Sequence, residues 1–123
     1  MVALHHIALG ARDVEGVAQF YRDVFGLTEL GRHLDDAGHL RSIWLDLGDS
    51  ILMVERTEEG RRRVEGVGAG PFLLAFSIRP GERSQVEARL EARGAPIEER
   101  TDFSSYARDP EGNRVAISHY PQR

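Results

Sequence analysis

The chain has 123 residues, a length that fits one domain with a core large enough to fold alone. It carries a net charge of −4 with no basic stripe, which argues against nucleic acid as a partner, and the lack of cysteine and lysine excludes disulfides, thiolate sites and Schiff-base chemistry. No apolar run is long enough to span a membrane and the first residues do not form a signal peptide, so we expect a cytoplasmic protein.

The first half of the chain reads as one strand, one helix and three strands. Residues 3–10 alternate and predict a strand. Asp13 is suited to be the N-cap of a helix over about 14–25, whose apolar side chains share one face and which ends at Gly26. Three further strand-like runs complete this half: about 28–34, 40–47 and 50–55.

The second half repeats this order after a break. Residues 56–70 are charged and then glycine-rich, which predicts an exposed linker, and we interpret Arg61-Arg62-Arg63 as solvated surface, with partner binding as the alternative. A helix is expected at about 83–93, before Gly94. The expected strands lie at about 72–78, 96–100, 103–108 and 113–118.

Each half is therefore a β-α-β-β-β unit, the first over about 1–55 and the second over about 71–119. A helix with one apolar face must bury it on a sheet. Two such units most simply pair their sheets, which predicts an α+β fold in which two tandem βαβββ modules form a curved mixed sheet with an open cup.

Strand parity separates side chains under the helices from side chains that face the cup. The side chains expected under the helices are Ile7, Leu9, Leu52, Val54, Leu74, Phe76, Ile78, Val115 and Ile117. Those expected in the cup are His6, Ala8, Gly10, Ile51, Met53, Glu55, Leu73, Ala75, Ser77, Arg114, Ala116 and Ser118. Small residues among the second set leave room for a ligand.

Two longer motifs point to a family. They are the stretch His6…Asp13…Phe20-Tyr21-Arg22-Asp23-Val24-Phe25-Gly26 and the turn Arg108-Asp109-Pro110-Glu111-Gly112-Asn113. With these motifs the chain resembles the vicinal oxygen chelate superfamily, which includes glyoxalase I, methylmalonyl-CoA epimerase, extradiol dioxygenases, and fosfomycin and bleomycin resistance proteins. The resemblance covers nearly the whole chain and implies a homodimer, but it does not select an activity, because one fold hosts many chemistries.

In the metal-dependent members, the resemblance implies ligands from four strands: a His, a Glu, a His or Glu, and a Glu. Carried over in order, these positions fall on His6, Met53, Leu73 and Ala116. Only His6 keeps a donor, whereas even catalytic zinc usually has three protein ligands. We therefore expect no metal and no other cofactor.

Three alternatives for a metal remain. Glu55 lies on the predicted face of Met53 and a small shift would bring it beside His6, which would give a divalent metal two ligands. His119 would need a bulge to turn inward. A hairpin also carries donors across its turn, which we interpret as exposed polar residues: His33, Asp35 and His39.

Several side chains are candidates for contact with a ligand. His6 has three interpretations: a hydrogen-bonding group for a bound molecule, a structural histidine, or a general base or metal ligand. His5 has the opposite parity and is expected to be structural or exposed. Trp44 offers stacking surface or packs in the core, and Tyr106 offers its hydroxyl or is merely exposed. The ligand-binding candidates are His6, Trp44, Met53, Glu55, Leu73, Tyr106 and Ala116.

The leading hypothesis is a protein that binds a small, largely apolar molecule in the cup without a metal, of the sequestering kind that bleomycin resistance proteins represent. The competing hypothesis is a glyoxalase- or epimerase-like isomerase or lyase, in which His6 and Glu55 serve as acid and base, with or without a divalent metal. A third class, a module that binds a partner or is purely structural, predicts no cavity of ligand size.

Overall fold

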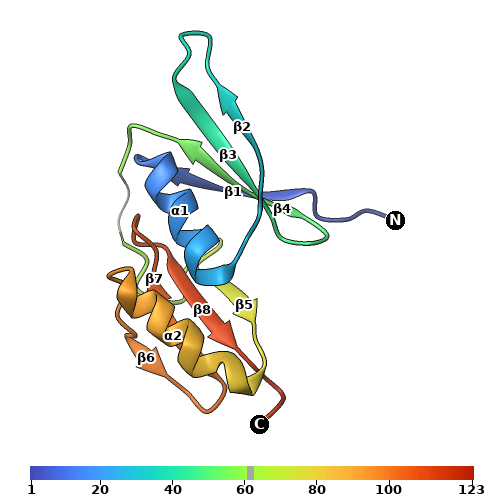
Figure 1. The fold of residues 1–123 in the computed structure, drawn as a ribbon, viewed down its shortest axis with the longest axis vertical. Coiled ribbons are helices and arrows are strands. Elements are labelled where there is room, and N and C mark those ends of the chain that lie inside the picture. Colours follow the sequence, from blue (N-terminus) through green and yellow to red (C-terminus); the bar gives the residue numbers. More distant parts are fainter. Residues whose placement is uncertain (61–62) are drawn as a thin grey trace. The chain divides into compact units, whose positions relative to one another are not determined.

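The computed structural model describes residues 1–60 and 63–123, so the expectation for Arg61 and Arg62 lies outside the described residues. The chain divides into two compact units, Met1–Arg61 and Arg62–Arg123, called here the first and the second module. Figure 1 labels the helix and the strands of each module. Each module contains one of the two repeats expected from the sequence.

The first module consists of one helix and a four-stranded mixed sheet. Its elements in chain order are β1 (His6–Ala11), α1 (Val14–Phe25), β2 (Glu29–Leu34), β3 (Leu40–Asp46) and β4 (Ile51–Arg56). The strand order is β1-β4-β3-β2. β1 pairs with β4 in parallel, whereas β3 is antiparallel to both of its neighbours.

Helix α1 begins and ends as the sequence predicts. The side chain of Asp13 accepts a hydrogen bond from the backbone N–H of Gly16 at 2.9 Å, which caps the first turn. Gly26 ends the helix with φ 69°, a left-handed conformation that favours glycine. Between these ends, Val17, Phe20, Tyr21 and Val24 bury one face of α1 on the sheet.

The second module repeats this architecture. Its elements are β5 (Leu74–Ser77), a short 3-10 helix η1 (Pro80–Glu82), α2 (Arg83–Ala92), β6 (Glu99–Arg100), β7 (Ser104–Arg108) and β8 (Arg114–Ser118). The order β5-β8-β7-β6, with β5 parallel to β8, matches that of the first sheet. The predicted α+β fold of two tandem βαβββ modules is thereby confirmed. β6 is shorter than the expected run at 96–100, although the backbone N–H of Glu98 still donates to the carbonyl oxygen of Tyr106 at 2.8 Å.

The Asp-Pro-Glu-Gly-Asn motif forms the turn between β7 and β8. Asp109 is 4% exposed and Asn113 is 6% exposed. One carboxylate oxygen of Asp109 accepts the backbone N–H groups of Glu111 and Asn113, each at 2.9 Å, and the other accepts the Asn113 side-chain amide at 2.8 Å. Gly112 completes the turn with φ 89°. These motif residues therefore hold a turn together.

In each module one face of the sheet carries the helix, and the opposite face is called here the helix-free face. Ile43, Leu45, Leu52 and Val54 lie on the helix side of the first sheet with no exposed area. Val115 and Ile117 do the same in the second sheet, as parity predicted. In the part of the chain that the structure describes, no helix is long and apolar enough to cross a membrane.

Candidate ligand-binding site on the first module

Trp44 lies at the centre of the helix-free face of the first sheet. The strand register places Met53 of β4 directly opposite it, with Ala8 of β1 beyond Met53 and Gly31 of β2 on the other side. Two large side chains therefore stand in one row between two residues that occupy little space. Such a row leaves open surface on both sides of an aromatic and thioether platform.

Three histidines surround the indole ring, and together with Trp44 they are called here the Trp44 cluster. The His6 ring is stacked with Trp44 at a centroid distance of 6.0 Å, and the His33 ring lies at 5.0 Å. His5 lies 6.4 Å from Trp44, and its Nδ1 is 2.9 Å from Nδ1 of His6. That spacing is a hydrogen bond in which one imidazole donates and the other accepts.

The indole N–H of Trp44 has no hydrogen-bond acceptor among the described residues, although the nitrogen atom itself is buried. A buried donor without an acceptor costs about 1–3 kcal/mol, and such groups are rare in native proteins. Ser42, one position before Ile43 on β3, is 2% exposed and is hydrogen-bonded to His33 at 3.3 Å.

The structure does not bring His6 and Glu55 together. β1 and β4 are parallel, with His6 opposite Ile51 and Gly10 opposite Glu55. The two candidates therefore lie four residues apart along the strand pair, roughly 13 Å at 3.3 Å per residue. Glu55 instead forms an ion pair with Arg41, whose Nε lies 3.5 Å from Oε1.

The remaining candidates lie in the second module. Ala116 of β8 stands between Ala75 of β5 and Tyr106 of β7 on the helix-free face of that sheet. The guanidinium of Arg114 lies 4.8 Å from the centre of the Tyr106 ring, a cation–π contact. Leu73 is half-buried directly before β5. Parity is correct for this module, but Trp44, the most distinctive candidate, belongs to the first.

The side chains at the four family ligand positions do not fit a divalent metal ion. His6 supplies an imidazole, but Met53 offers a thioether in the Trp44 row and Ala116 offers only a methyl group, 3% exposed between other small and aromatic side chains. Leu73 has no donor atom. Hard cations require several oxygen or nitrogen ligands. No group of three or more His, Cys, Asp or Glu side chains within residues 1–60 and 63–123 is arranged to hold a metal.

The hairpin between β2 and β3 does not gather its donors at one point. His33 turns to Trp44, whereas Asp35 accepts a hydrogen bond from Arg56 at 2.8 Å. The Arg56 guanidinium lowers the pKa of the Asp35 carboxyl to about 2, with help from the backbone N–H of His39. The exposed His39 ring remains 3.9 Å from Asp35. This hairpin is stabilised by an ion pair, in agreement with the interpretation as surface polar residues.

His119 also serves the fold. Its ring is 8% exposed, its Nδ1 lies 2.5 Å from the carbonyl oxygen of Gln122, and its Nε2 lies 3.5 Å from Arg83 of α2. A neutral ring that donates from Nδ1 and accepts at Nε2 satisfies both contacts. His119 therefore does not turn toward the helix-free face.

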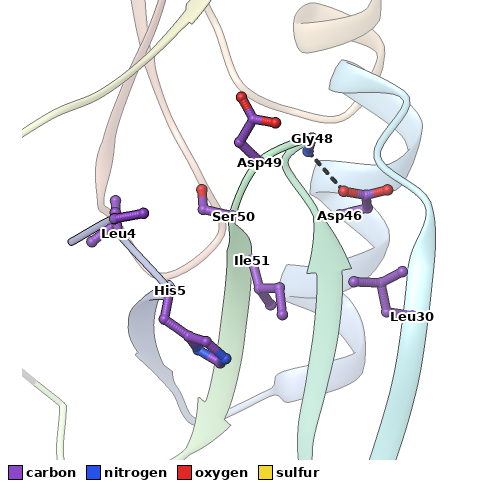
Figure 2. A pocket seen from close by; sticks show the side chains of 9 residues that line it. Leu4, His5, Leu30, Asp46, Gly48, Asp49, Ser50 and Ile51 are labelled. Atoms are coloured by element: carbon purple, nitrogen blue, oxygen red, sulfur yellow. Dashed lines mark hydrogen bonds between the residues drawn. The ribbon is translucent and has the colours of Figure 1, made fainter. Parts of the chain in front are cut away.

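A hollow of about 530 Å³ opens at the end of the first sheet, beside the Trp44 cluster. It is lined by residues 3–5, Leu30, Asp46 and residues 48–51. In Figure 2, Asp46 and Asp49 lie at the turn between β3 and β4, with Ile51, Leu30, His5 and Leu4 below and to the sides. Its volume falls in the range of small-molecule sites, about 300–1,000 Å³.

His5, Asp46 and Asp49 line this hollow but were not among the candidates predicted from the sequence. His5 was given a strand parity, but β1 begins only at His6, so His5 is free to turn toward Trp44. Asp46 and Asp49 flank Gly48, a pattern typical of a simple turn, and only the fold places them beside the N-terminal segment. The one available signal was the parity of Asp46, which it shares with Trp44.

The matches to known proteins extend over nearly the whole chain. A family model described as Glyoxalase/Bleomycin resistance protein/Dioxygenase superfamily matches residues 3–117. No curated protein matches the sequence. Among solved structures, a lactoylglutathione lyase from Agrobacterium tumefaciens is similar at 27% identity with a TM-score of 0.66, covering 96% of this chain and 93% of that one.

Two other solved structures are similar in fold. A glyoxalase/dioxygenase from Nostoc punctiforme has 23% identity and a TM-score of 0.79, with coverage of 98% of this chain and 92% of that chain. The fosfomycin resistance protein FosX from Listeria monocytogenes, complexed with Mn(II) and 1S,2S-dihydroxypropylphosphonic acid, has 19% identity and a TM-score of 0.79, with coverage of 96% and 92%. At these identities the likeness shows the fold alone.

Proposed function

Because the chain belongs to the glyoxalase/bleomycin resistance protein/dioxygenase superfamily, we propose that it uses that scaffold to bind a small, largely apolar molecule without the metal of its metal-dependent relatives. The observation that carries the proposal is the Trp44 cluster on the helix-free face of the first sheet. A buried indole N–H without an acceptor, an aromatic platform and an adjoining hollow together support a ligand there.

Apolar burial would supply most of the affinity, at about 25 cal/mol for each Å² removed from water before the cost of ordering. The polar groups of the Trp44 cluster would set the orientation of the ligand. The indole N–H donates, and the His5–His6 pair can donate or accept. This combination of apolar contacts and a few orienting polar groups is typical of small-molecule sites.

The competing proposal, a glyoxalase- or epimerase-like isomerase or lyase, requires His6 and Glu55 to act on one substrate. Their backbones are offset by four residues, roughly 13 Å along the strands, which does not favour joint action of the two side chains on one carbon centre. Glu55 is instead engaged in an ion pair with Arg41. Binding is therefore the better-supported function.

We also propose a homodimer, as small members of the superfamily commonly pair, and sedimentation velocity would test it.

The test uses the neutral apolar dye N-phenyl-1-naphthylamine, which accepts excitation energy from tryptophan. Trp44 is the only tryptophan of the chain, so energy transfer reports binding at its own site. We expect saturable transfer with one dye per chain. Ala8→Phe fills the open side of the Met53–Trp44 row and should abolish it, whereas Ala88→Phe, on the exposed surface of α2, should not.

The same purified protein would be analysed for metals after equilibration with Mn²⁺, Zn²⁺ and Ni²⁺. We expect no stoichiometric metal after gel filtration and dye binding that is independent of these ions. A stoichiometric ion that is lost in His6→Ala would overturn the metal-free part of the proposal. Absence of saturable transfer in the wild-type protein would overturn the binding part.

A further inference from the structure

We propose that the hollow of the first module takes a small organic cation, a molecule with a protonated amine at one end and an apolar body. This inference rests on the proposed function, because it names the class of ligand that the site binds. Its basis is the charge of the hollow, which differs from that of the surrounding surface.

The carboxylates of Asp46 and Asp49 have no cationic partner. Within the described ranges neither takes part in a salt bridge, and no arginine lines the hollow. The neighbouring arginines of the first module are already paired with other carboxylates. These pairs are Arg22 and Arg32 with Glu29, Arg41 with Glu55, and Arg56 with Asp35. The hollow therefore carries uncompensated negative charge.

Asp46 is held in place for this role. It closes β3 on the same face as Trp44, and its Oδ1 accepts the backbone N–H of Gly48 at 2.7 Å (Figure 2). This bond fixes the plane of the carboxylate and leaves Oδ2 to accept from a ligand. A fixed acceptor loses less entropy on binding than a free surface carboxylate does.

Beside the two carboxylates, His5 and Ser50, the lining of the hollow is apolar. Leu4 is 59% exposed and Leu30 is 53% exposed, and both flank the half-buried Ile51. A hydrophobic body placed between them would cover surface that otherwise faces water. An anionic ligand would meet two carboxylates without a counter-charge, and a neutral ligand would desolvate them without compensation. A cation with an apolar body matches both the carboxylates and the apolar side chains of the lining.

The experiment compares three probes with the same apolar body: phenylbutylammonium, phenylbutanol and phenylbutyrate. Ligand-observed saturation-transfer NMR and quenching of Trp44 fluorescence would give the dissociation constants. We expect the ammonium probe to bind about fivefold to tenfold more tightly than the alcohol at low salt, with the difference shrinking as salt rises. The butyrate should bind most weakly.

Substitutions locate the charge effect. Asp46→Asn keeps the carbonyl acceptor for Gly48 and should weaken the ammonium probe about fivefold while leaving the alcohol unchanged. Asp49→Asn, at an exposed position, should act in the same direction and does not put the fold at risk. Asp36→Asn removes the same charge at the far hairpin and should change neither probe.

The outcomes separate the two proposals. Equal affinity for the ammonium and the alcohol, or equal loss in Asp36→Asn and Asp46→Asn, would overturn the cation inference but leave the binding function intact. Weaker probe binding at higher protein concentration would also overturn it, since a second copy of the chain would then occupy the hollow. If N-phenyl-1-naphthylamine also fails to bind, the proposed function itself is wrong.

Discussion

Replacing Trp44 with phenylalanine tests whether this side chain serves a ligand or the fold. The indole nitrogen is buried and lacks an acceptor in the described structure, so the N–H lowers the stability of the folded state by about 1–3 kcal/mol. Phenylalanine removes this group and gives up at most about 1 kcal/mol of apolar burial, from roughly 40 Å² of lost contact area. We therefore expect Trp44→Phe to leave the free energy of unfolding unchanged or to raise it by about 1 kcal/mol.

The affinity for a ligand should move in the opposite direction. If the indole donates to an acceptor on the bound molecule, its loss should weaken binding by about threefold to tenfold, which corresponds to one neutral hydrogen bond. Stability is measured by urea unfolding followed by far-ultraviolet circular dichroism, with the slope of the transition as a check on two-state behaviour. Binding is measured by saturation-transfer NMR, since the substitution removes the fluorescent reporter.

A loss of more than about 2 kcal/mol in Trp44→Phe would refute this reasoning. Such a loss requires that the N–H finds an acceptor in the folded protein and contributes to its stability. Trp44→Leu serves as a control, because it removes the aromatic face as well and should lower stability by more than phenylalanine does.

Three further predictions concern the turn, the hairpin and the metal. Asp109→Ala should lower the free energy of unfolding by about 3 kcal/mol, since it leaves the N–H groups of Glu111 and Asn113 unsatisfied; a loss below about 1 kcal/mol in urea unfolding would contradict this role. The pKa of Asp35 is lowered from 3.8 to about 2, so its contribution to stability is complete above pH 3.8 and is lost as the pH falls toward 2. Arg56→Gln should raise the pKa of Asp35 toward 3.8 in an NMR titration, and an unchanged titration would show that Arg56 is not the cause. Dialysis against EDTA should leave the melting temperature and dye binding unchanged, because removal of a bound metal would lower both.

The fold could be predicted because alternation and helical periodicity are local signals. The ends of α1 follow from Asp13 and Gly26, whose chemistry determines where a helix begins and ends. Parity correctly predicted the buried side chains of β4, Leu52 and Val54, because burial on one face fixes the register of a strand. In β8 the expected cup residue Ala116 is buried as well.

The candidate site was harder to predict because it depends on register between distant strands. Nothing in the two strand sequences states that His6 stands opposite Ile51 and not opposite Glu55. Three separate segments of the chain line the hollow, so no residue spacing within one segment predicts it. His5 joined the Trp44 cluster because β1 starts at His6, three residues later than the strand expected from residue 3, a shift within the usual uncertainty of element boundaries.

The parallel pairing of β1 with β4 governs when the site can form during folding. The β2–β3 hairpin can close early because its strands are neighbours in sequence, whereas β1 pairs with β4, the last strand of its module. Contacts between such distant segments form late, because closing the loop must precede the gain from pairing. His6 thus reaches Trp44 only once β4 has docked. A nascent chain that stops before residue 51 would hold Trp44 and His33 but would lack Met53 and the strand that brings His6 to Trp44. Ligand binding would therefore mark completion of the first module.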